Sequence, residues 1–257
     1  MKKIWTAFSA VLGALAFAGC SLFLRSTPSP IPTQRTQSSA ATRTETLVIF
    51  LPGRGGSPGE FERKGFVQTL RDAGVNVDTV SVDAHLGYYY NRSVIERLQA
   101  DVIQPARKQG YRRIVVVGIS LGGLGALLNE RDQPGTVDAI VVLAPYLGRK
   151  DALFDRIAEA GGPAVWARGR DPQAGTIEEQ AWTFLGTHAT ELPPTWLLWG
   201  ERDRYARGHR LLATLLPKER VRTIDGAHDW PTWSALWKQL CVDSDLFSAE
   251  KAGGGAR

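Results

Sequence analysis

The stretch that decides the fold is Arg112–Asn129, RRIVVVGISLGGLGALLN. Its first half is a run of β-branched apolar residues, typical of a strand that is buried on both faces. Residues 118–122 then read GISLG, which has the form G-x-S-x-G. In this motif a serine lies on a sharp turn between a strand and a helix, and the tight backbone leaves no room for side chains at the two glycines. The stretch therefore predicts a strand, a turn that exposes Ser120, and a helix.

The predicted helix after Ser120 adds a chemical feature to the turn. The unpaired N–H groups and the positive dipole end of a helix that begins at Leu121 would stabilise negative charge beside Ser120. Acyl transfer to a serine requires such stabilisation. The pentapeptide also occurs by chance in glycine-rich turns. A non-catalytic Ser120 is therefore an alternative until partner residues are considered.

The N-terminal residues predict export and lipidation. Residues 1–3 are basic at two positions, residues 4–18 are apolar, and small residues lead to Cys20. This pattern is typical of a secretory signal peptide, here residues 1–19, and is short for a membrane span. The sequence FAGC resembles the lipobox of bacterial lipoproteins, with Phe17 where leucine is usual. The resemblance implies that Cys20 is acylated and, with Ser21 after it, that the protein is anchored in the outer membrane facing the periplasm. An ordinary signal peptide or an uncleaved anchor is the alternative.

Composition divides the rest of the chain into three parts. Residues 20–45 are rich in Ser, Thr, Pro and Gln and predict a lipidated N-terminus with a flexible linker. Residues 46–245 predict one globular domain, and residues 246–257 a flexible tail. Cys241 has no disulfide partner once Cys20 carries lipid, so the sequence supports neither a metal site nor a catalytic cysteine. We expect no cofactor.

The charge distribution argues against a nucleic-acid-binding protein. The chain has 31 Lys and Arg residues and 26 Asp and Glu residues, but five of the basic residues and none of the acidic ones precede Glu45. From Glu45 onward the basic and acidic residues are therefore equal in number, at 26 each. A nucleic-acid partner would require a basic face on the folded part, and this balance removes the main support for one.

Strands and helices alternate through the predicted domain. The predicted strands are residues 46–51, 75–82, 113–117, 137–143, 195–199 and 221–224, and the predicted helices are residues 60–73, 93–108, 208–216 and 231–240. This alternation predicts the α/β class, with a doubly wound, mainly parallel sheet of about six strands. Ligands of such sheets bind at the carboxyl ends of the strands.

With this alternation and the motif around Ser120, residues 46–240 resemble the α/β-hydrolase superfamily in a minimal form. The resemblance implies a catalytic order Ser, Asp, His. Ser120 would be the nucleophile, Asp203 in WGERD the orienting acid, and His228 in DGAHDW the base. Glu201 is the nearest competitor of Asp203, and Asp225 is local to His228.

Other candidates fit ordinary structural roles. Asp229, like Asp225, is typical of a turn or helix cap, where a short carboxylate accepts hydrogen bonds from backbone N–H groups. His209 falls inside or at the start of a predicted helix, where we expect a surface or capping residue.

Two backbone N–H groups would form the oxyanion hole. The resemblance implies that one is the N–H of Leu121 and that the other is the N–H of Arg54. Arg54 lies in LPGRGG, residues 51–56, which resembles the His-Gly-x-Gly loop of the family with Pro52 where histidine is common. A phosphate-binding glycine loop is the weaker alternative, because no Gly-Lys-Ser/Thr follows.

Two further stretches are candidates for the substrate pocket. Tyr88 and Tyr89, in HLGYYY after the second strand, would line the pocket or pack under a loop. Residues 146–193, between two consecutive strands, exceed an ordinary connection and predict a helical lid insertion. Trp166 and Trp182 in this segment would line the pocket, and His188 would be structural or substrate-facing.

The chain is also locally similar to serine esterases of the esterase D and feruloyl esterase kind, through GISLGGLGAL and HDWPTW. This similarity implies hydrolysis of a small-molecule or lipid ester, carboxylic or thioester, through an acyl-enzyme. The alternatives are an acyltransferase or lysophospholipase that acts on envelope lipids, and a non-catalytic envelope lipoprotein that retains the fold. The sequence predicts neither the substrate nor the oligomeric state.

Overall fold

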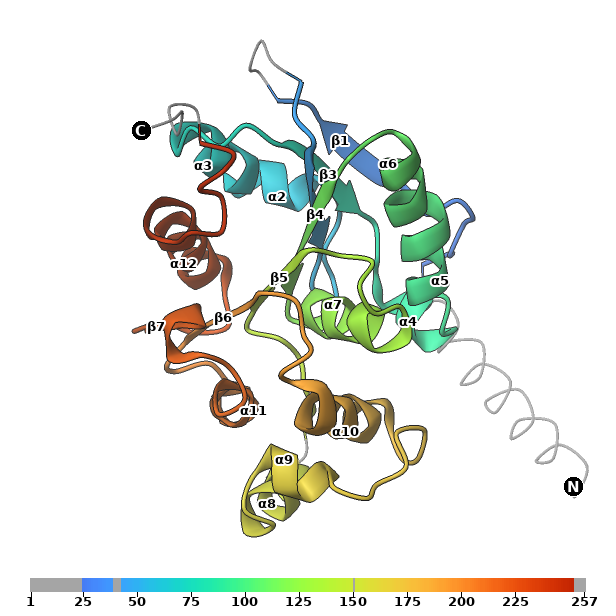
Figure 1. Cartoon of the computed structure of the whole chain (residues 1–257), viewed down its shortest axis with the longest axis vertical. Coiled ribbons are helices and arrows are strands. Elements are labelled where there is room, and N and C mark those ends of the chain that lie inside the picture. The colour runs from blue at the N-terminus through green and yellow to red at the C-terminus, as the bar shows by residue number, and fades with distance from the viewer. Residues whose placement is uncertain (1–24, 39–42, 150, 252–257) are drawn as a thin grey trace, which may run out of the picture.

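The computed structural model describes residues 25–38, 43–149 and 151–251. The predicted signal peptide and Cys20 lie outside these residues. The described chain forms a seven-stranded sheet with helices packed against both faces (Figure 1). The predicted α/β class is therefore confirmed, with one strand more than expected.

All but one of the strands run parallel. They are β1 (Thr33–Thr36), β2 (Thr46–Leu51), β3 (Asp78–Val82), β4 (Arg113–Ile119), β5 (Ala139–Leu143), β6 (Thr195–Gly200) and β7 (Val221–Ile224). Their order in the sheet is β1-β3-β2-β4-β5-β6-β7, and only β1 is antiparallel to its neighbour. The central strand β4 pairs Val116 with Ile49 on one side and with Ile140 on the other. The apolar runs of β2, β4, β5 and β6 are buried on both faces because helices cover the sheet on each side.

The helices agree with the expected alternation, but several expected helices are broken into shorter segments. They are α2 (Gly59–Arg63), α3 (Phe66–Asp72), α4 (Leu86–Tyr90), α5 (Val94–Leu98), the π-helical turn η1 (Gln99–Ile103), α6 (Gln104–Lys108), α7 (Leu121–Asp132), α8 (Asp151–Glu159), α9 (Pro163–Ala167), α10 (Ile177–His188), α11 (Ala206–Ala213), the 3₁₀ turn η2 (Lys218–Arg220) and α12 (Trp230–Asp243). The helix expected over residues 60–73 breaks at Gly65, whose φ of 80° is left-handed. Within the described ranges, no helix combines the length and apolar character that crossing a membrane would need.

An aromatic cluster holds α3 and α12 against the sheet. Phe50 of β2 stacks on Phe61 at 4.7 Å between ring centroids, and Phe66 stacks on Trp237 at 5.5 Å. The indole N–H of Trp237 donates to the carbonyl of Phe66 at 3.0 Å, so the buried polar atom is satisfied. This cluster covers one face of the sheet, and α7 packs against the central strands β2, β4 and β5.

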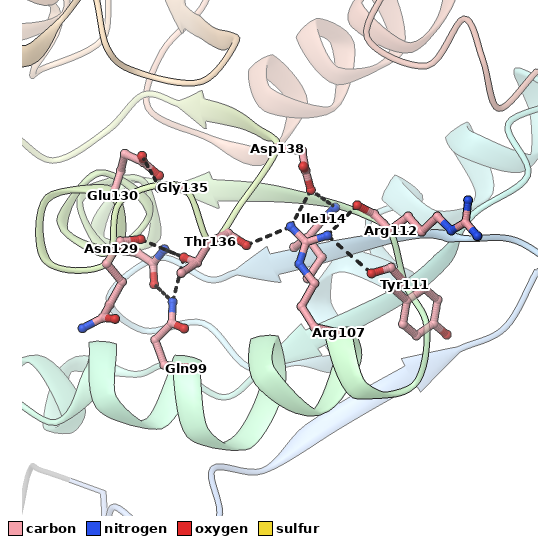
Figure 2. A network of polar contacts seen from close by, with 11 residues as sticks. Gln99, Arg107, Tyr111, Arg112, Ile114, Asn129, Glu130, Gly135, Thr136 and Asp138 are labelled. Atoms are coloured by element: carbon pink, nitrogen blue, oxygen red, sulfur yellow. Dashed lines mark hydrogen bonds and ion pairs between the residues drawn. The ribbon is translucent and has the colours of Figure 1, made fainter.

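A buried polar network fixes the far end of α7 (Figure 2). The side-chain amide of Gln99 donates to Asn129 Oδ1 at 2.8 Å and to Thr136 Oγ1 at 2.9 Å. The Asn129 amide in turn donates to Thr136 Oγ1 at 3.2 Å. The network thus joins η1, α7 and the loop that leads to β5.

Both predicted flexible segments are partly folded onto the domain. Within the expected linker, Thr33–Thr36 forms β1 because its backbone pairs with the edge of β3. Within the expected tail, Leu246 and Phe247 are buried, and Glu250 accepts a hydrogen bond from Thr46 Oγ1 at 2.9 Å. These parts of the linker and tail predictions are therefore wrong, because the polar composition hid a backbone pairing and two apolar anchors.

Candidate active site

The turn that contains Ser120 has the geometry that the sequence predicts. Ser120 lies between β4 and α7 with φ 53° and ψ −111°, a conformation that residues with a side chain rarely adopt. A Cβ added to Gly118 would lie 2.2 Å from the carbonyl oxygen of Gly122. A Cβ added to Gly122 would lie 2.1 Å from the carbonyl oxygen of Leu51. Both glycines are therefore needed for the close approach of backbone segments around Ser120.

Three side chains from the ends of different strands form a hydrogen-bonded series. His228 Nε2 lies 3.0 Å from Ser120 Oγ, and His228 Nδ1 lies 2.7 Å from Asp203 Oδ2. The Asp203 side chain is fully buried and that of His228 is 7% exposed. Because a carboxylate only accepts hydrogen bonds, Nδ1 carries the proton and Nε2 is left to accept from the serine hydroxyl. The structure thus brings together the three residues expected from the sequence.

The competing acids are engaged elsewhere. Glu201 Oε1 lies 3.3 Å from the Thr223 hydroxyl, and Asp225 pairs with Arg202 at 2.9 Å. Asp229 caps α12, where its Oδ1 accepts the N–H of Thr232 at 3.0 Å. The Thr232 side chain, as the largest cause, and this backbone N–H lower the pKa of the Asp229 carboxyl. Asp203 is the acid that contacts His228.

Asp203 is held by its own loop. Its second oxygen, Oδ1, accepts the backbone N–H of Tyr205 at 2.8 Å. The Tyr205 ring lies perpendicular to the His228 ring at 5.0 Å, and the Trp233 ring lies perpendicular to the same imidazole, also at 5.0 Å. Sequence reasoning missed these two aromatic residues, although Tyr205 follows Asp203 by two positions and Trp233 lies in the HDWPTW motif. Together they restrict the orientation of the imidazole.

His209 is not at the surface as expected. It is buried in α11, its Nε2 lies 2.9 Å from the carbonyl oxygen of Pro145, and its ring faces Trp199. Burial, the largest cause, lowers the pKa of His209 to about 4, so the imidazole is neutral and Nε2 donates to Pro145. The loop it contacts continues into Tyr146, whose N–H donates to the carbonyl oxygen of Ser120 at 2.8 Å. The prediction failed because the helical pattern around His209 does not reveal which face packs inward.

The two backbone segments expected to form an oxyanion hole both lie beside Ser120. Leu121 is the first residue of α7, a position at which the N–H has no acceptor within the helix. The loop after β2 passes close to the serine, since a Cβ added to Gly53 would lie 3.6 Å from Ser120 Cβ. Arg54 lies in the turn that the Gly56 N–H closes by donating to the carbonyl oxygen of Gly53 at 3.0 Å.

A cavity of about 1240 Å³ opens beside Ser120. One wall consists of Leu121, Leu124 and Leu128 on α7, together with residues of α4 and α5. The other comes mostly from the segment between β5 and β6, the predicted lid, which contributes Tyr146, Gly148, Arg149, Phe154, Gln173, Gly175, Thr176, Ile177, Glu178 and Gln180. The cavity is large enough for a ligand of drug size or larger.

Only one of the four aromatic residues expected in the pocket lines this cavity. Tyr89 does, whereas Tyr88 is buried away from it and donates its hydroxyl to the carbonyl oxygen of Pro28 at 2.8 Å. Trp182 is fully buried and donates its indole N–H to the carbonyl oxygen of Leu147 at 2.9 Å. Trp166 is buried beneath the Arg170 guanidinium, 4.1 Å from the ring centroid. The expectation was therefore wrong for Tyr88, Trp166 and Trp182, which anchor their segments instead.

Solved structures with the same arrangement of strands and helices come from several organisms. S-formylglutathione hydrolase from Staphylococcus aureus is 14% identical with a TM-score of 0.60, over 85% of this chain and 95% of that one. Est1E from Butyrivibrio proteoclasticus is 15% identical with a TM-score of 0.54, over 82% and 91%. A putative non-heme bromoperoxidase from Mycobacterium tuberculosis is 16% identical with a TM-score of 0.54, over 87% and 97%. At these identities the likeness concerns the fold.

Comparison with curated proteins found no match. The model of the Alpha/beta hydrolase family matches residues 48–247, which include Ser120, Asp203 and His228. This match covers most of the chain and agrees with the sheet order and the turn at Ser120. The chain therefore belongs to the α/β-hydrolase family.

Proposed function

We propose that the protein is a serine hydrolase that cleaves a carboxylic ester or thioester. The observation that carries this proposal is the hydrogen-bonded series from Ser120 through His228 to Asp203. Family membership supports it, and the names S-formylglutathione hydrolase and ferulic acid esterase among the similar structures agree with it.

In the proposed reaction, His228 Nε2 accepts the Ser120 proton while Ser120 Oγ attacks the carbonyl carbon of the ester. The oxyanion that forms faces the N–H groups of Leu121 and Arg54. The intermediate collapses when His228 returns the proton to the leaving alcohol or thiol, and an acyl-enzyme remains. A water molecule then repeats the two steps, releases the carboxylic acid and restores the serine. Throughout, Asp203 holds the tautomer of His228 and stabilises the imidazolium.

Labelling with a fluorophosphonate probe tests the proposal directly. The probe forms a covalent bond with an activated serine, so the wild-type full-length protein is expected to label and the Ser120→Ala variant is not. Since a hydroxyl removed from a surface turn has little effect on packing, both proteins should unfold at similar temperatures. Absence of labelling in the wild type, or equal labelling of the variant, would refute the proposed role of Ser120.

We also propose that the protein is anchored in the bacterial envelope by lipid on Cys20, in the outer membrane facing the periplasm. The support is the FAGC sequence after an apolar run, followed by Ser21. Metabolic incorporation of a clickable palmitate analogue into the wild type but not into Cys20→Ala is the expected result. Equal incorporation would refute the anchor and would leave the hydrolase proposal unaffected.

A further inference from the structure

We infer that the substrate is an ester of an apolar acyl chain with an alcohol that carries an anionic group, a carboxylate or a phosphate. The inference rests on the proposed hydrolase function and names the class of substrate for the same site. It follows from two walls of the cavity beside Ser120 that differ in character, one apolar and one cationic.

The apolar wall is a hydrophobic cluster that is separate from the main core. Its buried members on α7 are Leu121, Leu124 and Leu128, which share one helix face, and Leu86 and Ile95 pack against them. All five also line the cavity. The wall begins at the residue next to the proposed nucleophile and follows α7 for about 10 Å, from the rise of an α-helix. An acyl chain bound to Ser120 would bury apolar surface along this wall.

Tyr89 packs against α7 beside the apolar wall. Its hydroxyl is buried and has no hydrogen-bond partner in the part of the chain that the structure describes. Gly125 provides the space for it, since a Cβ there would lie 2.2 Å from this hydroxyl. Burial raises the pKa of Tyr89, so its hydroxyl is uncharged. Arg131 and Asp132, at the end of α7, also line the cavity but pair with each other. The acyl part of the substrate therefore meets a largely apolar surface next to Ser120.

The cationic wall holds an excess of arginine. Among the described residues, six arginines line the cavity, against the two carboxylates of Asp132 and Glu178. One of the six, Arg207, also pairs with Asp155, which does not line the cavity. The domain from Glu45 onward has no net charge, so positive charge is concentrated at this cavity. Both carboxylates are already engaged. Asp132 pairs with Arg131 at 2.6 Å, and Glu178 accepts the hydroxyl hydrogen of Tyr146 at 3.0 Å.

Three of the lining arginines, Arg54, Arg149 and Arg204, lie on loops that follow β2, β5 and β6. These loops are at the carboxyl edge of the sheet, where Ser120 also lies. All three are exposed, and none forms an ion pair with a carboxylate among the described residues. A guanidinium without a carboxylate partner retains its hydrogen-bond donors for a carboxylate or phosphate of a ligand.

The position of Arg204 assigns the anionic group to the alcohol part of the ester. Its guanidinium lies 5.1 Å above the ring of Tyr205, which contacts His228 at 5.0 Å and Tyr146 at 5.5 Å. In the proposed reaction His228 protonates the departing alcohol, so the alcohol part lies on this side of Ser120. The acyl part extends in the other direction along α7. Cationic and apolar walls thus match the two halves of one amphiphilic ester.

Two pairs of esters test the inference on the full-length protein. Para-octanoyloxybenzoate is compared with its neutral methyl ester, and octanoyl glycerol phosphate with monooctanoyl glycerol, so that the first pair tests a carboxylate and the second a phosphate. We expect kcat/KM to favour the anionic member of at least one pair. Added salt should reduce this preference, because the guanidiniums are exposed.

Arginine variants separate the contribution of the guanidiniums from intrinsic differences in reactivity between the esters. Arg149→Gln and Arg204→Gln are each expected to reduce the ratio of anionic to neutral kcat/KM by roughly fivefold, mainly through KM, which is near the upper end for one exposed charge pair. Arg204→Lys should retain much of the ratio, since it keeps the charge. Arg168→Gln is the matched control, because Arg168 is exposed on the same connection but outside the cavity lining, and the ratio should not change.

The outcomes distinguish the inferred substrate class from the proposed hydrolase function. Equal kcat/KM within both pairs, or a preference that neither arginine variant alters, would overturn the inferred substrate class and leave the hydrolase proposal intact. Labelling by the fluorophosphonate without hydrolysis of any of the four esters would also overturn the inference alone. Failure of both labelling and hydrolysis would overturn the hydrolase proposal and, with it, the inference.

Discussion

At the scale of single residues, the site depends on glycines, which have no side chain, as much as on its polar side chains. The turn at Ser120 requires backbone segments of β2, β4 and α7 to approach within distances that a Cβ would occupy. Gly118 and Gly122 supply that space, whereas Gly53 and Gly55, in the loop after β2, are less constrained. The difference between these glycines can be measured.

Gly122→Ala is expected to lower the free energy of unfolding by about 2 to 3 kcal/mol, because the new Cβ would meet the Leu51 carbonyl and displace β2 or the turn. Fluorophosphonate labelling of Ser120 should fall in the same variant. Gly55→Ala is the control, since a Cβ there has nothing within 4 Å. Urea unfolding and labelling rates provide the two readouts. Similar stability of both variants would contradict the proposed packing.

His209 gives the molecule a pH-dependent contribution to stability. Its pKa is about 4 in the folded protein and 6.5 in the unfolded chain. The unfolded chain therefore binds a proton first as the pH falls, and folding is penalised between pH 6.5 and about 4. The full contribution, about 3 kcal/mol, is present above the unfolded pKa and is lost as the pH falls through the folded pKa.

The matching variant is His209→Gln, whose amide can donate to Pro145 without titrating. Denaturant unfolding at several pH values between neutrality and the acid limit should show a shallower loss of stability for the variant than for the wild type. Titration of the other groups is shared by both proteins and cancels in the comparison. Parallel curves would show that His209 is not the group responsible.

At the scale of elements, α7 is fixed at both ends. Its N-terminus forms the turn at Ser120, and its C-terminal half carries Asn129, which contacts Gln99 and Thr136 (Figure 2). The same helix presents one leucine face to the cavity. A change at either end can therefore alter the wall along which we place the acyl chain.

Asn129→Ala is expected to destabilise the protein by about 2 kcal/mol, because it removes the hydrogen bonds of a fully buried amide with Gln99 and Thr136. The loss should appear in thermal unfolding, and fluorophosphonate labelling at low temperature should persist since Ser120 is at the opposite end of the helix. Gln133→Ala, at the exposed C-cap of α7, should unfold like the wild type. Equal effects of the two substitutions would argue against the network.

The elements show which parts of the fold are predictable from sequence. Strands β2, β4 and β5 could be predicted because each is an apolar run buried on both faces, and α7 because it follows a motif whose glycines have one steric purpose. The five-residue helix α4 and the four-residue strand β1 could not, because elements this short depend on tertiary partners rather than on periodicity.

The residues of the site can likewise be divided into those that the sequence predicts and those that it does not. Ser120, Asp203 and His228 were predictable because each lies in a motif after a strand. The pocket residues were not, because whether a tyrosine or tryptophan faces a cavity or the core depends on how residues 146–193 fold. Tyr205 and the lining arginines carry no motif, and only the structure brings them together.

At the scale of the whole molecule, residues 25–38 are part of the folded domain. Arg25 pairs with Asp83, the Ile31 N–H donates to Asp101 at 2.8 Å, and β1 covers the edge of β3. Ile31 is also buried, which contributes roughly 2 kcal/mol by its apolar area. The segment protects an otherwise open sheet edge.

A chain that begins at residue 43 is therefore expected to unfold at a lower temperature than one that begins at residue 25, and to associate through the uncovered edge of β3. Differential scanning calorimetry and size-exclusion chromatography at several concentrations provide the measurements. The chain that begins at residue 25 serves as the control because it retains β1 and the ion pair of Arg25 with Asp83. Identical melting and elution would show that the segment is dispensable.

The docking of residues 25–38 also determines how far the domain could reach from a membrane. A free linker up to residue 45 would let the cavity sample substrates at a distance. With Arg25 already on the domain, only residues 21–24 separate it from Cys20, a span of at most about 3.5 Å per residue. The docked segment touches α4 through Tyr88, and α4 also lines the cavity. If Cys20 carries lipid as proposed, the working range of the enzyme is the bilayer surface itself, and a longer spacer at this point would extend it to esters in solution.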